Sequence, residues 1–214
     1  MTSTIPPTER LILFTRYPEP GSTKTRLIPV LGAAGAADLH RRMVERTAAI
    51  AARLADRRPV FLEVRFEGGS PDRMAEWLGP RWVCRPQAGG DIGARMRAAL
   101  EAAFDGMVVR VVLIGSDIPG ITPALLEEAF ECLGDHDLVF GPAEDGGYYL
   151  LGARKDRFET LATALFSGIP WGTATVLHET LSALASSRAS VRRLKTLRDI
   201  DRPEDLAAWK EAGR

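Results

Sequence analysis

The sequence predicts a single α/β domain over residues 1–214, built on a mixed, mainly parallel β-sheet. The first observation is the stretch 108–117, V-V-R-V-V-L-I-G-S-D, in which β-branched residues run together and end at a glycine and an acid. Such a run is typical of a strand that is buried on both faces in a parallel sheet. The second observation is that short apolar runs alternate with helical patterns, which favours parallel strands joined by right-handed crossovers. The length of 214 residues fits one domain with a sizeable core.

The first half of the chain follows this alternation of strand and helix. Between residues 33 and 58 apolar residues recur at helical spacing, and Pro59 ends the pattern. Asp91 is the expected N-cap of another helix, whose apolar face repeats as far as Phe104. The strands expected in this half span residues 11–14, 60–64 and 82–84. The expected helices span residues 33–58, 71–78 and 92–104.

The second half of the chain predicts a change of strand direction. Its expected strands span residues 108–115, 138–141, 148–152 and 191–194, and its expected helices span 123–133 and 174–186. Thr122 and Pro123 are typical of a helix start. Only six residues separate the second and third of these strands, too few for a parallel crossover, so this pair should be antiparallel. Asp201 and Glu204 fit a capping box that opens a final helix.

Composition argues against several classes of protein. Lysine plus arginine and aspartate plus glutamate number 28 each, so no net charge suggests nucleic acid or an acidic membrane as a partner. Cys84 and Cys132 fit neither a metal-ligand spacing nor a disulfide framework, and the apolar runs are far shorter than a membrane span. The first ten residues lack the basic and apolar regions of a signal peptide. We therefore expect a cytoplasmic protein that binds neither nucleic acid nor membrane.

A cation-rich loop follows the first expected strand. Residues 15–26 read T-R-Y-P-E-P-G-S-T-K-T-R, in which glycine and small hydroxylated residues let backbone N–H groups approach phosphates while lysine and arginine neutralise charge. The loop is neither a Walker loop nor a dinucleotide fingerprint, because the glycines that these motifs require are absent. Solvated loop charges are the alternative. The candidate phosphate-binding residues are Gly21, Ser22, Thr23, Lys24 and Arg26.

Three aspartates form a candidate metal site. Asp117 lies just past the carboxyl end of the central strand, where open α/β sheets bind ligands. Asp199 and Asp201 are one residue apart, so both carboxylates can point to one side of an extended segment. Completed by waters and phosphate oxygens, the three would suit Mg²⁺ or Mn²⁺. Capping of a turn or helix is the alternative role for Asp117 and Asp201.

Other polar residues offer less chemistry. Gln87 could read a base edge, since an amide presents a donor and an acceptor side by side. His40, His136 and His178 are isolated, and we interpret each as a solvated or core histidine. Ser116 has no partner histidine and does not stand in the G-x-S-x-G elbow of a hydrolase. The sequence therefore indicates no activated nucleophile.

Five motifs resemble those of a bacterial family. They are P-x-P-G-S-T-K-T-R-L (18–27), Q-x-G-G-D-I-G-x-R-M (87–96), L-I-G-S-D-I-P (113–119), G-P-A-E-D-G-G-Y-Y-L-L-G (141–152) and L-x-D-I-D-R-P-E-D-L (197–206). In this order they cover nearly the whole chain, which resembles the GT-A-fold, nucleotide-diphospho-sugar-transferase-like family. Its members are often labelled glycosyltransferase and sometimes radical-SAM/selenodomain-associated transferase. The chain is also similar to phospholactate and phosphoenolpyruvate guanylyltransferases, and more distantly to molybdenum-cofactor nucleotidyltransferases.

The resemblance implies a GT-A-like, three-layer α/β/α sandwich and a set of site residues. These are Lys24 and Arg26 on the phosphates, Gln87 near the base, Asp117, Asp199 and Asp201 on the metal, and Gly146 and Gly147 against the acceptor or its phosphate. The chain departs from related families at two points. Its loop lacks the longer G-x-G-T-R-M-type signature, which leaves the direction of transfer open. Gly172 follows Trp171 where the family would have serine.

These residues together favour a metal-dependent transferase that uses a nucleotide. The reaction would move a nucleotidyl group from a nucleoside triphosphate to a small phosphorylated acceptor, or a sugar from a nucleotide sugar to a small-molecule acceptor. Lys24, Arg26 and Asp117 would be the catalytic residues, acting through alignment and charge neutralisation. A non-catalytic nucleotide-binding or scaffolding protein is the alternative. An NAD(P) oxidoreductase is disfavoured because the glycine fingerprint is missing.

Overall fold

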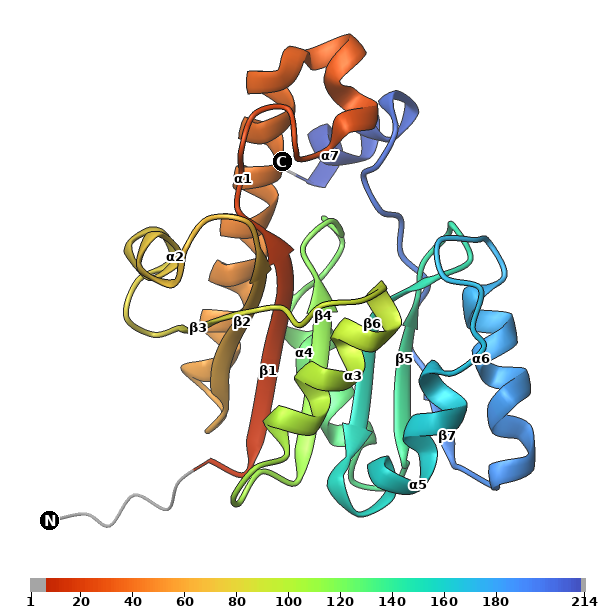
Figure 1. Cartoon of the computed structure of the whole chain (residues 1–214). Coiled ribbons are helices and arrows are strands. Elements are labelled where there is room, and N and C mark those ends of the chain that lie inside the picture. The colour runs from red at the N-terminus through yellow and green to blue at the C-terminus, as the bar shows by residue number, and fades with distance from the viewer. Residues whose placement is uncertain (1–6, 213–214) are drawn as a thin grey trace, which may run out of the picture.

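The computed structural model describes residues 7–212 and contains a seven-stranded β-sheet (Figure 1). The strands are β1 (Glu9–Arg16), β2 (Phe61–Glu67), β3 (Val83–Pro86), β4 (Arg110–Gly115), β5 (Leu138–Pro142), β6 (Tyr148–Arg154) and β7 (Val191–Arg193). They lie in the order β3-β2-β1-β4-β6-β5-β7. Strand β6 is antiparallel to its neighbours β4 and β5, and the other neighbouring strands are parallel. The mixed, mainly parallel sheet and the antiparallel β5–β6 pair are confirmed.

Helices cover both faces of the sheet (Figure 1). They are α1 (Ile28–Ala55), α2 (Pro71–Leu78), α3 (Ile92–Ala103), α4 (Pro123–Cys132), α5 (Lys155–Phe166), α6 (Val176–Leu184) and α7 (Leu206–Ala212), with 3₁₀ turns η1 (Thr25–Leu27), η2 (Ala185–Ser187) and η3 (Pro203–Asp205). On one face α1 and α4 contribute Leu54 and Phe130 to the core. On the other, α3 and α5 contribute Leu100 and Leu165. The three-layer α/β/α sandwich is confirmed.

Strand β4 lies between β1 and β6 and is buried on both faces, as its composition predicts. Val111, Val112 and Ile114 have no exposed surface, and Leu113 is buried as well. The three β-branched residues are typical of a strand that packs on both sides of a pleated sheet. The strand ends at Gly115, so Asp117 follows its carboxyl end directly.

Helix α1 begins earlier than the sequence predicts. The chain is helical from Ile28, but at Gly32 a φ of +70° interrupts the regular backbone, and the helix resumes at the predicted residue 33. Glycine adopts this left-handed conformation without the steric cost of a Cβ atom. The kink separates a first helical turn, beside the loop after β1, from the long body of α1 on the sheet.

The predicted capping box of Asp201 and Glu204 is wrong. The side chain of Asp205 instead accepts hydrogen bonds from the backbone N–H groups of Asp201, at 3.1 Å, and of Arg202, at 2.8 Å. The Asp201 carboxylate pairs with Arg26. Sequence spacing suggested the cap, but a cation from the other end of the chain takes this carboxylate.

A third apolar cluster joins the start of α1 to the end of the chain. Leu27, Leu39, Met43 and Ile200 pack together, and Trp209 of α7 is partly buried against them. In Figure 1 the start of α1 and α7 lie together beyond the carboxyl end of β1. The cluster therefore brings the segment before α7 beside the loop that follows β1.

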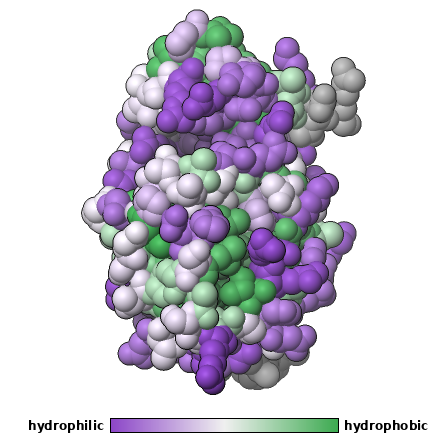
Figure 2. Space-filling view, turned by 90° about the vertical axis from the view of Figure 1, so that its right-hand side faces the viewer, coloured by the Kyte–Doolittle hydropathy of each residue, from purple (hydrophilic) through white to green (hydrophobic). Residues whose placement is uncertain are grey.

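Figure 2 shows the flank of the molecule that carries α5 and α6. Hydrophilic residues form a band across the upper half of this view, beneath a hydrophobic group at its very top, and hydrophobic residues reach the surface again in the lower part. Within residues 7–212, no helix combines the length and the apolar character that crossing a membrane requires.

Candidate functional site

A cavity of about 640 Å³ lies at the carboxyl ends of β1 and β4, where α/β sheets bind ligands. The predicted site residues on its wall are Ser22, Thr23, Lys24, Arg26, Gln87, Asp117, Gly147, Asp199 and Asp201. Gly21 and Gly146 are not among the residues that line it within the described chain. A second cavity, of about 590 Å³, shares Arg26, Asp199 and Asp201 with the first. The loop after β1 and the segment before α7 therefore meet at one site.

Lys24 lies between two of the predicted metal ligands. Its Nζ donates a hydrogen bond to Asp117 Oδ2 at 2.6 Å and lies 3.7 Å from Asp201 Oδ1. The Lys24 side chain is only 6% exposed. Its backbone has a φ of +49°, in the left-handed region that residues other than glycine rarely adopt, and η1 follows directly. The loop geometry therefore places this ammonium group directly between the two acids.

Arg26 reaches Asp201 from the solvent side. Its Nη1 donates to Asp201 Oδ2, and its side chain is 65% exposed. Exposed ion pairs contribute little to stability, so this guanidinium can exchange partners at small cost. Arg26 lines both cavities and is available to an anion that enters either of them.

Asp117 keeps its charge because of its neighbours. Burial would raise the pKa of this carboxyl, but the positive charge of Lys24 and the hydrogen bonds from Lys24 and Ser116 lower it below its usual value. Ser116 Oγ donates to Asp117 Oδ1 at 3.1 Å, while Lys24 holds Oδ2. Each carboxylate oxygen thus has its own donor, which fixes the orientation of the side chain.

His40 is the site residue that sequence reasoning missed. It is buried, as a core histidine would be, but it lies on the wall of the cavity and is not isolated. Its Nε2 is 3.1 Å from the backbone oxygen of Arg16, which can only accept, so Nε2 carries a proton. Its Nδ1 is buried without a hydrogen-bond partner in the described chain and lies 3.9 Å from Asp117 Oδ1. Burial lowers the pKa of His40, so the ring is neutral.

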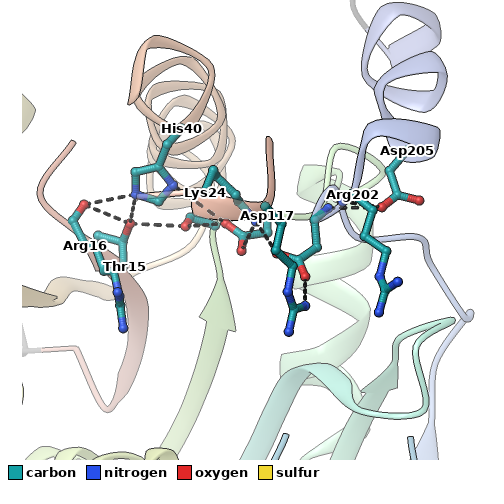
Figure 3. A network of polar contacts seen from close by, with 10 residues as sticks. Thr15, Arg16, Lys24, His40, Asp117, Arg202 and Asp205 are labelled. Carbon is teal, nitrogen blue, oxygen red and sulfur yellow. Dashed lines mark hydrogen bonds and ion pairs between the residues drawn. The ribbon is translucent and has the colours of Figure 1, made fainter. Parts of the chain in front are cut away.

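A chain of polar contacts links His40 to Asp117 (Figure 3). Thr15 Oγ1 lies 3.4 Å from His40 Nε2 and 3.1 Å from Ser116 Oγ, which in turn donates to Asp117. Thr15 and Ser116 are both buried. Ser116 therefore has a structural role in orienting Asp117. A sequence signal for His40 was available: it lies four residues after buried Ala36, on the core-facing side of α1.

Gln87 lines the cavity, but much of its amide is already bonded. Its Nε2 donates to the backbone oxygens of Thr15, at 3.0 Å, and of Arg65, at 3.2 Å. Its Oε1 lies 3.5 Å from Arg95 Nη1, at the outer limit of a hydrogen bond. The amide nitrogen thus ties the ends of β1 and β2 together. Contact between Gln87 and a base remains a prediction, with the carbonyl oxygen as the group that is available.

Gly146 and Gly147, the glycine pair after β5, have different roles. Gly146 has a φ of +90°, and a Cβ atom there would lie 1.9 Å from the backbone oxygen of Ala174, so only glycine fits. Gly147 lines both cavities, and its N–H donates to Asp145 Oδ1 at 2.9 Å. Contact of either glycine with an acceptor remains a prediction.

Asp199, on the wall of both cavities, lies in a different electrostatic setting from Asp117. Burial raises the pKa of Asp199, and the charge of Asp145 raises it further.

The acids fit an Mg²⁺ or Mn²⁺ ion that completes its coordination with phosphate oxygens. Such ions take one or two protein carboxylates plus waters and substrate phosphates. Asp117 and Asp201 already converge on one cationic group, Lys24 Nζ, at 2.6 and 3.7 Å. Within residues 7–212 no three acidic, histidine or cysteine side chains are grouped as metal ligands. The three-aspartate site with Asp199 therefore stays a prediction.

Comparison with known proteins identifies the family. The family described as "Uncharacterized protein conserved in bacteria (DUF2064)" matches residues 36–173. The chain belongs to the DUF2064 family. A crystal structure from Desulfovibrio desulfuricans G20, described as a candidate nucleotide-diphospho-sugar transferase, is 37% identical to this DUF2064 protein. The match covers 97% of this chain and 88% of that one, with a TM-score of 0.88. No curated protein matches.

More distant structures share the fold of this DUF2064 protein. The 4-diphosphocytidyl-2C-methyl-D-erythritol synthase of Anaerococcus prevotii DSM 20548 is 11% identical, with 97% of each chain covered and a TM-score of 0.63. Rv0371c of Mycobacterium tuberculosis H37Rv, in complex with manganese, is 17% identical, with 96% of this chain and 99% of that chain covered and a TM-score of 0.56. The GT-A-like, nucleotide-diphospho-sugar-transferase fold expected from the motifs is confirmed.

Proposed function

We propose that this DUF2064 protein is a metal-dependent transferase that uses a nucleotide substrate. It moves a nucleotidyl group from a nucleoside triphosphate to a small phosphorylated acceptor, or a sugar from a nucleotide sugar to a small acceptor. One observation carries the proposal: Lys24 and Arg26 meet Asp117 and Asp201 on the wall of one cavity at the carboxyl ends of β1 and β4. The relative from Desulfovibrio desulfuricans, a candidate nucleotide-diphospho-sugar transferase, supports it.

Lys24 and Arg26 would bind the phosphates of the substrate. Lys24 and Arg26 border the first cavity together with Ser22 and Thr23, so two cations and two small hydroxylated residues face an anion that enters it. Phosphoryl transfer needs little covalent chemistry from the protein, and alignment with charge neutralisation supplies most of the rate. Lys24 and Arg26 supply positive charge where the substrate develops negative charge.

The acidic residues of the site would be the ligands of the metal ion. Asp117 and Asp201 would hold Mg²⁺ or Mn²⁺, and Asp199 lines the same cavity as a further oxygen ligand. When bound there, the ion would neutralise phosphate oxygens of the nucleotide. The low pKa of Asp117 keeps this carboxylate charged at neutral pH, as a metal ligand requires.

The second cavity provides a place for the acceptor. It opens on the same acids as the first, through Asp199 and Asp201, so an acceptor bound there would lie next to the phosphates. Trp171 and Arg198 contribute an apolar surface and a cation to its wall. Gly172 lines it without a side chain, so the hydroxyl that serine would supply at this position is absent.

A nucleotide panel tests the proposal. The protein is incubated with Mg²⁺ and each of GTP, CTP, UDP-glucose and GDP-mannose, and melting temperature and products are measured. A transferase is stabilised by one nucleotide and, with a mixture of phosphorylated small acceptors, releases pyrophosphate or free nucleoside diphosphate. Stabilisation without either product would favour a nucleotide-binding protein without turnover. Absence of stabilisation by all four would contradict the proposal.

A further inference from the structure

The ammonium group of Lys24 lies at a position where one cation can neutralise both Asp117 and Asp201. It contacts Oδ2 of Asp117 and lies near Oδ1 of Asp201, the oxygens that the other donors leave free. Ser116 takes the second oxygen of Asp117, and Arg26 takes the second oxygen of Asp201. The Lys24 side chain is almost fully buried, whereas Arg26 stays at the surface. The free protein therefore carries its own cation between the two carboxylates.

Among the described residues, Arg26 is the other cationic side chain paired with these acids, and it reaches Asp201 alone, from the surface. His40 Nδ1 lies 3.9 Å from Asp117 Oδ1, beyond hydrogen-bond distance, and its Nε2 is the nitrogen that lies against the backbone oxygen of Arg16. A divalent ion and an ammonium group cannot share the same two oxygens, because at such separations like charges repel strongly in a partly buried site. One cation must leave before the other enters.

We propose that Lys24 is the resident counter-ion of Asp117 and Asp201, and that it excludes divalent cations until the phosphates of a nucleotide draw it away. This inference rests on the proposed function and adds the regulation of the same site. Lys24 lines the first cavity, and its flexible four-carbon stem lets the ammonium group exchange carboxylates for phosphates without movement of the sheet. Metal and nucleotide binding are then coupled, and by linkage each raises the affinity for the other.

The coupling has a functional consequence. Without nucleotide the acids stay neutralised, so the protein does not hold a metal ion ready to activate water or unintended phosphates. With nucleotide bound, Lys24 neutralises the phosphates and Asp117 and Asp201 become free to ligate. Lys24 thus neutralises the carboxylates in the empty site and the phosphates of the substrate in the filled site.

Titration with Mn²⁺ alone tests the inference, followed by electron paramagnetic resonance of the free ion. Lys24→Met removes the resident cation with little change in size, and it should bind Mn²⁺ at least about tenfold more tightly than the wild type. Lys155→Met is the matched control, because Lys155 Nζ contacts Gly106 at the opposite end of the sheet. It should bind Mn²⁺ as the wild type does. Equal Mn²⁺ affinity of the wild type and Lys24→Met would overturn the inference.

Two further measurements keep the test decisive. The double variant Lys24→Met, Asp117→Asn should lose the gain in Mn²⁺ affinity, and retention of the gain would place the ion elsewhere and overturn the inference. In EDTA, Lys24→Met should melt at a lower temperature than the wild type, and Mn²⁺ should raise its melting temperature more. If Lys24→Met does not fold, Lys24→Gln replaces it. These readouts need no nucleotide, so a failed nucleotide panel with tighter Mn²⁺ binding would reject the proposed function alone.

Discussion

At the scale of single residues, Asp117 depends on a small set of donors. Lys24 and Ser116 each hold one of its oxygens, and His40 lies close by as a neutral ring. The charge of Lys24 and these hydrogen bonds outweigh burial and lower the pKa of Asp117. The residue is thus ionised and oriented before any ligand arrives, which is the preorganisation that a catalytic carboxylate requires.

Asp117→Asn should abolish turnover while the fold remains intact. The amide has the same shape but cannot balance a metal ion or Lys24, so we expect the rate to fall by at least about 100-fold. Initial rates with the nucleotide selected by the panel measure this, and circular dichroism checks the fold. Asp72→Asn, at an exposed position of α2, is the control and should keep the wild-type rate. Normal turnover in Asp117→Asn would refute the catalytic role.

His40 should make stability depend on pH. Burial lowers its pKa in the folded protein, opposed by the charge of Asp117 and by the hydrogen bond to the backbone oxygen of Arg16. As pH falls through about 6.5, the unfolded chain takes up the proton first, so the free energy of unfolding decreases; at higher pH both states are neutral and the effect vanishes. His40→Gln should lose this part of the dependence.

Urea unfolding in EDTA at roughly pH 5.5 and pH 7.5 measures this difference. The wild type should lose more free energy of unfolding between the two values than His40→Gln does. His178→Gln, on α6 outside the cavity, is the control and should behave as the wild type. The same pH dependence in His40→Gln as in the wild type would show that His40 does not titrate as its burial requires.

At the scale of elements, α3 approaches the loop before α6 through a single glycine. A Cβ atom on Gly93 would lie 2.3 Å from the ring of Trp171, so the helix surface must be flat there. Trp171 in turn stacks on Phe166 and meets Tyr148 edge-on. The contact holds in place the loop that lines the second cavity.

Gly93→Ala should therefore destabilise the protein although alanine favours helices. Overpacking costs about 1–3 kcal/mol, which exceeds the gain of about 1 kcal/mol in helix propensity. Gly35→Ala in α1 is the matched control, because its Cβ meets only Leu31 Cβ, at 3.2 Å, and it should be close to neutral. Urea denaturation of both variants measures the difference. A stabilised Gly93→Ala protein would contradict the packing of Trp171 on α3.

At the scale of the whole molecule, the two ends of the chain build one site. Ile200, between Asp199 and Asp201, is fully buried beside Leu27 and the body of α1. Its backbone N–H donates to the backbone oxygen of Asp117 at 3.0 Å. A single residue thus fixes the late aspartates against both the loop after β1 and the end of β4.

Ile200→Ala should cost about 2–5 kcal/mol of the free energy of unfolding and loosen the acids. Ile200→Val removes one methylene at the same place and should cost only about 0.5–1.5 kcal/mol. Urea denaturation gives both values, and Mn²⁺ titration in the presence of nucleotide should show weaker binding in Ile200→Ala. If Ile200→Ala is no less stable than Ile200→Val, the segment before α7 is not anchored through this side chain.

Much of this architecture is local and can be read in the sequence. The apolar run 111–114, in which three residues are β-branched, is typical of a strand buried on both faces, and the five residues between β5 and β6 are too few for a parallel crossover. The glycine and cation content of the loop after β1 and the acid after β4 likewise indicated a site at the carboxyl edge of the sheet. Neighbouring residues determine these features, so no knowledge of distant contacts is needed.

The pairing of side chains was decided by the tertiary structure. Lys24 meets Asp117 across 93 residues, and no local pattern distinguishes a lysine that will bind phosphate from one that already neutralises an acid. Asp201 satisfied the spacing of a helix cap, yet Arg26 takes its carboxylate. His40 appeared isolated because its partners, Thr15 and Arg16 at the end of β1 and Asp117 after β4, are distant in the sequence. Electrostatic and hydrogen-bonding energies depend on distance in space, and those distances are set by the packing of α1 on the sheet and of α7 on the start of α1.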